Sequence, residues 1–295
     1  MSLLQEINKK FHIPDAYEKW ADYRNELTDF IVQGICKVKE QTNQETLSLL
    51  ILGAGSCNDI DLSRIAANGV QITLLDIEKS GMEEACEKYN VEAACVEESI
   101  TGITGQDLDI LAGELLGYLR QEYQSNKLTK EAFLEKMQND LSALLFARET
   151  EEEFINRLMH CFGDGEYDMI LGAGVLSQLY ALPLYLVETI KKNAEEQIFH
   201  EDIDPDETLH KIVREANEKW IPIIVKEMLG ASRGVGIFAS EENKISPVEG
   251  AKQCLEMIQD YCSESKIEVD ECLLSWSFDL ANNRSYMMRV QAVFV

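Results

Sequence analysis

Apolar residues follow two different spacings along the chain, and the change from one to the other marks strands and helices. Five short apolar runs are typical of strands buried on both faces of a parallel sheet. They lie near 49–52, 71–75, 92–96, 167–171 and 234–240. Between them, apolar residues recur at helical spacing, while the last two runs flank a polar turn and predict an antiparallel hairpin, 271–279 and 286–295. The pattern predicts an α/β fold: a Rossmann-like seven-stranded sheet, mostly parallel, with helices on both faces.

The stretch 47–78 has the pattern of one strand-helix-strand unit of such a sheet. Its first strand is followed at once by Gly53 and Gly55, which lack a Cβ and so permit a sharp turn and close approach of a ligand to the backbone. Its second strand delivers Asp76 to the carboxyl end, the edge at which open α/β sheets bind ligands. An acid at this distance from the glycines can accept hydrogen bonds from both ribose hydroxyls. The unit therefore predicts a nucleoside-binding turn.

The glycine spacing discriminates between two kinds of nucleotide ligand. A dinucleotide fingerprint would place its third glycine at position 58, where this chain has Asn58. A diphosphate at the start of the next helix would also face Asp59 and Asp61, which is electrostatically unfavourable. S-adenosylmethionine has no phosphate, and acids near the turn could hold its ammonium group. The spacing favours methyl transfer over nicotinamide-dependent oxidation, and so does the terminal hairpin, because dinucleotide dehydrogenases typically end on a sixth parallel strand.

With these motifs the chain resembles the class I S-adenosylmethionine-dependent methyltransferases. The resemblance rests on LLILGAGSC as the glycine motif, on Asp76 as the ribose acid and on YDMILGAGVLSQL at 167–179 as the fourth-strand motif. Two positions depart from the family pattern: Ile51 stands where the family has an acid, and Cys57 where it has a third glycine. We expect Cys57 to replace a small residue rather than to act as a nucleophile.

The resemblance implies S-adenosylmethionine as the cofactor and assigns roles at the strand ends. The methionine part would lie against the turn, the ribose at the end of the second strand, the adenine after the third strand, and the methyl group above the end of the fourth. The corresponding residues are Gly53, Ala54 and Gly55; Asp76 with Ile77; Glu97 or Glu98; and Gly172, Ala173 and Gly174. Substrate-side candidates by the same resemblance are Trp20, Tyr23, Arg24 and Gln178. The alternative for the aromatic residues is that they only dock their helix on the sheet.

The spacing of the helical patterns also predicts the organisation of the chain. Residues 1–46 form an N-terminal helical region that the family uses as a lid, and 47–295 form the cofactor-binding domain. Segment 99–165 contains three helical patterns where one helix would suffice, so we interpret it as a helical insertion that covers the substrate or makes a homodimer contact. Pro222 is expected to kink or break its helix, and 246–249 has the pattern of a capping box.

Composition narrows the classes of partner. With 27 basic and 53 acidic residues the net charge is −26, which repels phosphate backbones, so we expect a small, neutral or cationic substrate and no nucleic acid. The eight scattered cysteines predict reduced thiols in a cytoplasmic protein. The N-terminal segment lacks an apolar signal core, and no apolar run approaches a membrane span. His200 and His210 lie among acids without a metal-binding spacing, so no metal is expected.

The sequence leaves two functions open. The first is a methyltransferase acting on a small molecule, with an N-, O- or S-acceptor unresolved and no residue that stands out as a general base. The second is a catalytically silent nucleotide-fold binding or scaffold protein, which Ile51 and Cys57 keep open because a fold does not determine function.

Overall fold

A single seven-stranded sheet organises the computed structural model, which describes residues 13–163, 165–176, 178–242, 251–265, 267–279, 282 and 284–295. The strand order is β3-β2-β1-β4-β5-β7-β6. Strand β7 is antiparallel to both neighbours, and the other pairings are parallel. The strands are β1 Leu47–Leu52, β2 Val70–Asp76, β3 Ala93–Glu97, β4 Tyr167–Ala173, β5 Ser232–Glu241, β6 Glu268–Asp279 and β7 Arg284–Phe294. The predicted Rossmann-like sheet with its terminal hairpin is confirmed.

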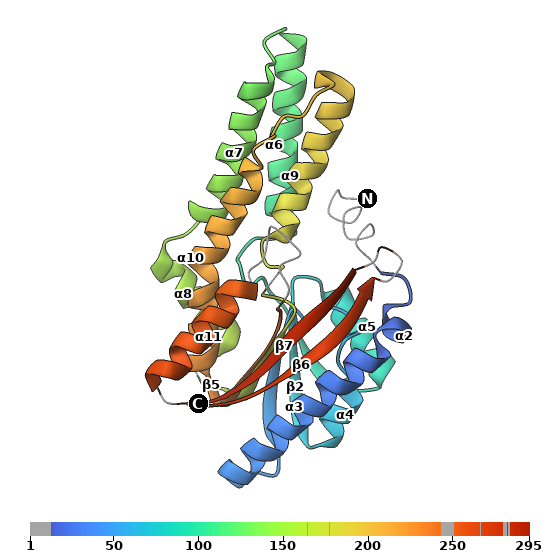
Figure 1. Ribbon diagram of the computed structural model, residues 1–295, viewed down its shortest axis with the longest axis vertical. Coiled ribbons are helices and arrows are strands. Elements are labelled where there is room, and N and C mark those ends of the chain that lie inside the picture. The colour runs from blue at the N-terminus through green and yellow to red at the C-terminus, as the bar shows by residue number, and fades with distance from the viewer. Residues whose placement is uncertain are drawn as a thin grey trace.

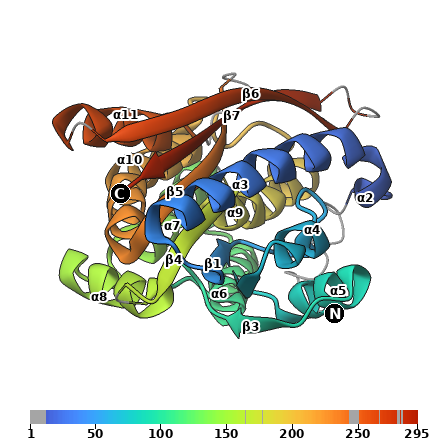
Figure 2. The same ribbon diagram turned by 90° about the horizontal axis from the view of Figure 1, so that it is seen from below.

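Helices cover both faces of this sheet (Figure 2). One face carries α2 Ala16–Lys19, α3 Ala21–Thr42, α4 Leu62–Ala67 and α5 Lys79–Tyr89. Strand β1 contributes to both layers, because Leu49 and Ile51 pack with α3 and α4 while Leu50 and Leu52 pack on the other face. Because both faces of β1 are buried, its sequence is a continuous apolar run and does not alternate with polar residues.

The other face carries the remaining helices, of which several extend away from the sheet as an elongated helical arm (Figure 1). They are α6 Gly105–Gln124, α7 Lys130–Phe146, α8 Glu151–Phe162, α9 Ala181–Ala194 with the π-helical turn η1 Glu195–Phe199, α10 Thr208–Ala231 and α11 Ala251–Ser265. The three helices between β3 and β4 begin where threonine side chains cap them, at Thr104, Thr129 and Thr150. They fall where helical spacing in segment 99–165 placed them.

The packing around α10 decides the effect of its proline. Pro222 does not break the helix, which continues to Ala231, because Trp220, Ile221 and Ile224 around it are buried in the core. Tertiary packing therefore outweighs the lost backbone hydrogen bond. The helix begins at Thr208, and the Asp204 carboxylate accepts hydrogen bonds from the backbone N–H groups of Thr208 and Leu209. The expected capping box at 246–249 lies outside the described residues.

Candidate functional site

A cleft of about 480 Å³ opens at the carboxyl ends of β1, β2 and β4. It is lined by the turn 53–59, the strand end 75–77, the loop 98–101 and the segment 173–175, together with Trp20, which lies between α2 and α3, and aromatic residues from β6. Because β1 lies between β2 and β4 in the sheet, this edge is the topological switch point, where open α/β sheets bind ligands. The volume is in the range of small-molecule sites.

The turn after β1 is built on left-handed backbone. Gly53 has φ +61° and Gly55 has φ +47°. A Cβ on Gly53 would overlap the side chain of Val175, whose own Cβ is only 2.7 Å away, whereas a Cβ on Gly55 would meet nothing within 4 Å. The backbone at Gly55 is therefore open to a ligand in the cleft.

Cys57 packs beneath this turn. Its thiol donates to the carbonyl oxygen of Ala54 at 3.3 Å, and the side chain is buried. Burial raises the pKa of Cys57 well above its ordinary value, so the thiol stays protonated near neutral pH. The geometry fits a packing role at the position where the family pattern has glycine, and it does not fit a nucleophile.

Asp76 is held in a fixed orientation at the end of β2. Its Oδ2 accepts a hydrogen bond from the backbone N–H of Gly55 at 3.0 Å, and its Oδ1 accepts one from the N–H of Glu78 at 3.0 Å. Burial raises the pKa of Asp76, and these two backbone hydrogen bonds oppose that shift. Each oxygen keeps a further lone pair, so the carboxylate can accept hydroxyl hydrogen bonds from a ligand in the cleft.

The start of α4 is unsuited to a phosphate. Asp61 caps this helix by accepting from the backbone N–H of Arg64 at 3.2 Å, so its own carboxylate occupies the position that an anion would take. Asp59, two residues earlier, lines the cleft. Burial raises the pKa of Asp59 to about 6, partly opposed by its own backbone hydrogen bond and by the positive charges of Arg24 and Lys88.

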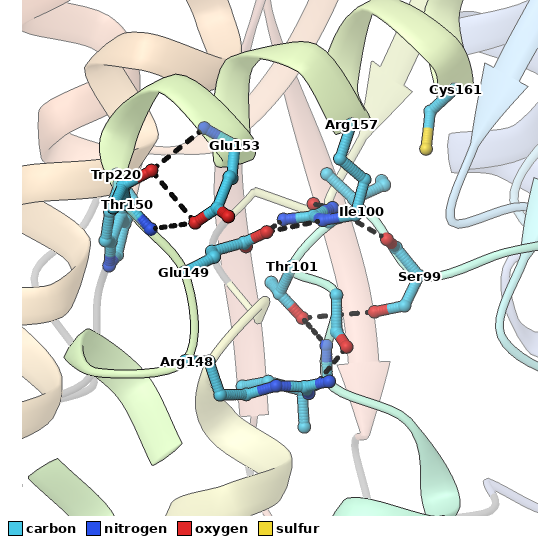
Figure 3. A network of polar contacts seen from close by, with 12 residues as sticks. Ser99, Ile100, Thr101, Arg148, Glu149, Thr150, Glu153, Arg157, Cys161 and Trp220 are labelled. Atoms are coloured by element: carbon cyan, nitrogen blue, oxygen red, sulfur yellow. Dashed lines mark hydrogen bonds and ion pairs between the residues drawn. The ribbon is translucent and has the colours of Figure 1, made fainter. Parts of the chain in front are cut away.

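The loop after β3 is fastened to the helical insertion by arginine side chains (Figure 3). The Arg157 guanidinium of α8 donates to the carbonyl oxygens of Ser99, at 3.0 Å, and Ile100, at 2.5 Å. The same group forms an ion pair with Glu149 at 2.7 Å. Because Ser99 and Ile100 line the cleft, Arg157 supports one wall of the site from outside.

Two further contacts tie the insertion to this loop. Arg148 donates to the carbonyl oxygen of Gly102 at 2.6 Å, and the Cys161 thiol donates to the carboxylate of Glu98 at 3.2 Å. The backbone N–H of Glu98 donates to the carbonyl oxygen of Asp76 at 2.9 Å. Glu98 therefore lies beside Asp76, the ribose acid of the predicted site, and is held in place by Cys161 and by the backbone of Asp76. Burial and the Glu98 carboxylate raise the pKa of Cys161 to about 12.

Aromatic rings form the opposite wall. Trp20 stacks on Phe278 with ring centroids 5.3 Å apart, and its indole N–H donates to the carbonyl oxygen of Phe278 at 2.8 Å. Trp276 packs edge to face on Trp20 at 5.0 Å and lies 3.8 Å from the position of a Cβ on Gly174. The N-terminal helix and the terminal hairpin thus meet over the end of β4.

The structure brings most of the sequence-predicted site residues to this cleft. Those that line it are Gly53, Ala54, Gly55, Asp76, Ile77, Glu98, Ala173, Gly174, Trp20 and Gln178. Four lie outside the lining: Glu97, Gly172, Tyr23 and Arg24. Their surroundings give the reasons.

Each of these four residues has another environment. Glu97 is exposed at the end of β3, and Gly172 lies against the side chain of Met228. Tyr23 is buried behind the wall and stacks on Trp276 at 4.8 Å. Arg24 is buried and donates to the carbonyl oxygen of Asn58 at 3.0 Å, so it supports the turn from outside. For Tyr23 the alternative given above applies: its ring docks α3 on the sheet and does not reach the cleft.

Sequence reasoning did not place two aromatic residues of the hairpin in the cleft. Neither Trp276 nor Phe278 is among the site residues predicted from the sequence. Both line the cleft. Trp276 is only 4% exposed, so its ring packs in the core and also forms part of the cleft wall. Their spacing of two residues on a strand puts both rings on one face, and this spacing is the sequence signal that could have indicated a shared surface.

No protein-family model and no curated protein sequence matches the chain. Among solved structures, it is similar to magnesium protoporphyrin IX methyltransferase from Synechocystis PCC 6803 crystallised with bound SAM, with 9% identity, a TM-score of 0.44, and coverage of 96% of this chain and 85% of that one. It is also similar to the N-methyltransferase NodS from Bradyrhizobium japonicum, with 10% identity, a TM-score of 0.38, and coverage of 89% and 92%.

These TM-scores lie below 0.5, so the fold assignment rests on the strand order and on the antiparallel β7. The arrangement is the Rossmann-like fold of the class I methyltransferases. Within the described residues no helix is long and apolar enough to cross a membrane, and no three His, Cys, Asp or Glu side chains are grouped to hold a metal ion.

Proposed function

We propose that the chain is an S-adenosylmethionine-dependent methyltransferase that acts on a small molecule. The observation that carries the proposal is the 3.0 Å hydrogen bond from the backbone N–H of Gly55 to the carboxylate of Asp76 at the cleft edge. It joins the open glycine backbone and the ribose acid into one unit, and both line the same cleft. A nucleoside with a short polar chain and no phosphate suits that unit.

The residues divide the work of binding between them. Gly53, Ala54 and Gly55 would receive the methionine part, Asp76 the ribose, and Glu98 the adenine edge, with Glu97 at the rim. Ala173 and Gly174 would form the floor beneath the methyl group, backed by Gly172. Bound S-adenosylmethionine supplies an electrophilic methyl group. The task of this chain is then to align the acceptor and to exclude water.

The alternatives are separated by specific features. A nicotinamide dinucleotide would bring its diphosphate to the helix start where Asp61 is the cap and Asp59 lies close by. A silent binding protein would hold the cofactor without turnover. Transfer of a radiolabelled methyl group from S-adenosylmethionine to any small-molecule acceptor distinguishes an enzyme from such a scaffold.

Asp76→Ala is expected to weaken S-adenosylmethionine binding at least tenfold, about 1.4 kcal/mol. The reason is that the ribose hydroxyls lose their acceptor and the N–H of Gly55 loses its partner. Isothermal titration calorimetry on the intact chain measures the effect. Glu92→Ala is the matched control, since it removes an exposed carboxylate outside the cleft and should leave the affinity unchanged. Absence of any binding to the unmodified chain contradicts the proposed function.

The predicted homodimer contact through the insertion and the cytoplasmic location stay proposals. Helix α6 exposes three large apolar side chains, Ile110, Leu116 and Tyr123. If they form the contact, sedimentation velocity should report a dimer and Leu116→Glu should convert it to a monomer. A monomeric unmodified chain at all tested concentrations rules the contact out.

A further inference from the structure

The charged side chains that line the cleft in the described part of the chain all have one sign. Three carboxylates line it, those of Asp59, Asp76 and Glu98, and no lysine, arginine or histidine is among the described lining residues. Asp76 and Glu98 are held by hydrogen bonds from backbone or thiol donors. The Asp59 carboxylate accepts no hydrogen bond from a described thiol or from the backbone of another described residue. A cleft of this charge attracts cations and repels carboxylates and phosphates.

Asp59 has an available carboxylate. In the described part of the chain it forms no ion pair and no hydrogen bond with another side chain, and its only acceptor role is toward its own backbone N–H. The two nearby cations have other partners: Arg24 donates to the carbonyl oxygen of Asn58, and Lys88 donates at 2.7 Å to the carbonyl oxygen of Ser56 and to the Asn58 side chain. Arg24 and Lys88 therefore act on the Asp59 carboxylate without a direct ion pair, and a cationic ligand would supply a direct partner.

The aromatic wall adds a second feature that favours a cation. Trp20, Trp276 and Phe278 line the same cleft as Asp59 and pack on one another at 4.8 to 5.3 Å. Aromatic faces attract organic cations through their quadrupoles, most strongly where water is excluded. They also carry the apolar part of such a ligand. The combination of one unpaired carboxylate and three rings is suited to an organic amine.

We propose that the methyl acceptor of this chain is a small organic amine bound as its cation, with its charge held between the Asp59 carboxylate and the rings of Trp20, Trp276 and Phe278. The inference rests on the proposed methyltransferase function and specifies its acceptor. Transfer to an ammonium group first requires loss of a proton, and the Asp59 carboxylate takes it. The nitrogen lone pair then forms the N–C bond, while the electrons of the broken C–S bond remain on sulfur.

The amine site has a defined pH dependence. Burial raises the pKa of Asp59 to about 6, and the groups that face it are Arg24 and Tyr23 from α3, Lys88 from α5 and the neighbouring Cys57. Above pH 6 the carboxylate is charged and holds the amine. As the pH falls through 6, it takes up a proton, so amine affinity should decrease between pH 7.5 and pH 5.

The test uses the intact chain saturated with S-adenosylhomocysteine. Calorimetry and thermal shift compare primary and secondary amines with alcohols and carboxylates of the same carbon skeleton, beginning with benzylamine, benzyl alcohol and benzoate. We expect amines to bind, and carboxylates not to bind. Asp59→Asn should weaken amine binding at least tenfold. Glu84→Gln, an exposed acid beside the turn and outside the cleft lining, is the matched control.

A second variant keeps the inference falsifiable if Asp59→Asn fails to fold. Trp20→Leu retains apolar volume and removes the aromatic face, so it should weaken amine binding more than alcohol binding. Failure to bind S-adenosylhomocysteine contradicts the proposed function itself. Three results with bound S-adenosylhomocysteine overturn only the amine assignment: no amine in the panel binds, alcohols bind equally well, or Asp59→Asn weakens cofactor binding instead.

Discussion

Gly53→Ala is expected to reduce S-adenosylmethionine affinity at least a hundredfold and to lower the free energy of unfolding by about 3 kcal/mol. The residue has φ +61°, where an alanine is strained, and the added Cβ would overlap the side chain of Val175. Relief of that overlap moves the turn or the segment after β4, and both line the cleft. Chemical denaturation and calorimetry measure the two effects.

Two other glycines serve as controls for this substitution. Gly55→Ala adds a methyl group in open space, so it should cost only about 1 kcal/mol of stability for its left-handed backbone, yet still obstruct the cofactor. Gly113→Ala lies on an exposed face of α6 with nothing near the added Cβ, and it should stabilise the helix by about 1 kcal/mol without changing affinity. Unchanged affinity in both Gly53→Ala and Gly55→Ala would show that no ligand lies against this turn.

The order of the central strands could be predicted because β1, β4 and β5 are buried along nearly their whole length, on both faces of the sheet. Ile51 illustrates this: it stands where the family pattern has an acid, and the structure buries its side chain between the sheet and the helices α3 and α4, with 1% exposure. An apolar residue is suited to that buried position. The departure from the family pattern therefore leaves the apolar run of β1, which predicts a strand, uninterrupted. Helix α10 shows the limit, because its continuation through Pro222 depends on packing with distant helices.

The cleft was predictable where its residues follow strand ends, and less so where it is formed by tertiary contacts. Gly53, Gly55 and Asp76 belong to one local unit, so their proximity follows from chain connectivity. Trp20 and Phe278 are 258 positions apart, and the hydrogen bond between them depends on how α3 meets the hairpin. An aromatic pattern in a sequence cannot distinguish the ring that lines a cleft from the ring behind it, which is the difference between Trp20 and Tyr23.

The helical insertion has a structural link to the cofactor cleft that its length alone did not indicate. Arg157 joins α8 to the loop after β3, and Glu149 from the turn before α8 neutralises its charge. The side chains of Arg157 and Glu149 are 21% and 23% exposed, so the pair is shielded from most solvent screening. The loop conformation that presents Ser99 and Ile100 to the cleft therefore depends on the insertion.

Arg157→Ala is accordingly expected to lower the free energy of unfolding by about 3 kcal/mol, because it leaves the Glu149 carboxylate and two backbone carbonyl oxygens without their donor. S-adenosylmethionine affinity should also fall at least tenfold, since the loop 98–101 is no longer held against the cleft. Urea denaturation and calorimetry report the two quantities separately.

Arg157→Lys should recover only part of both losses, because an ammonium group keeps the charge but cannot donate to Glu149 and to both carbonyl oxygens with the guanidinium geometry. Arg120→Ala is the control for loss of an arginine on the insertion, since this residue is exposed on α6 and no described residue pairs with it; it should change neither quantity by more than about 0.5 kcal/mol. If Arg157→Ala weakens folding and leaves cofactor affinity intact, the loop after β3 does not bind the cofactor, and the adenine must lie elsewhere in the cleft.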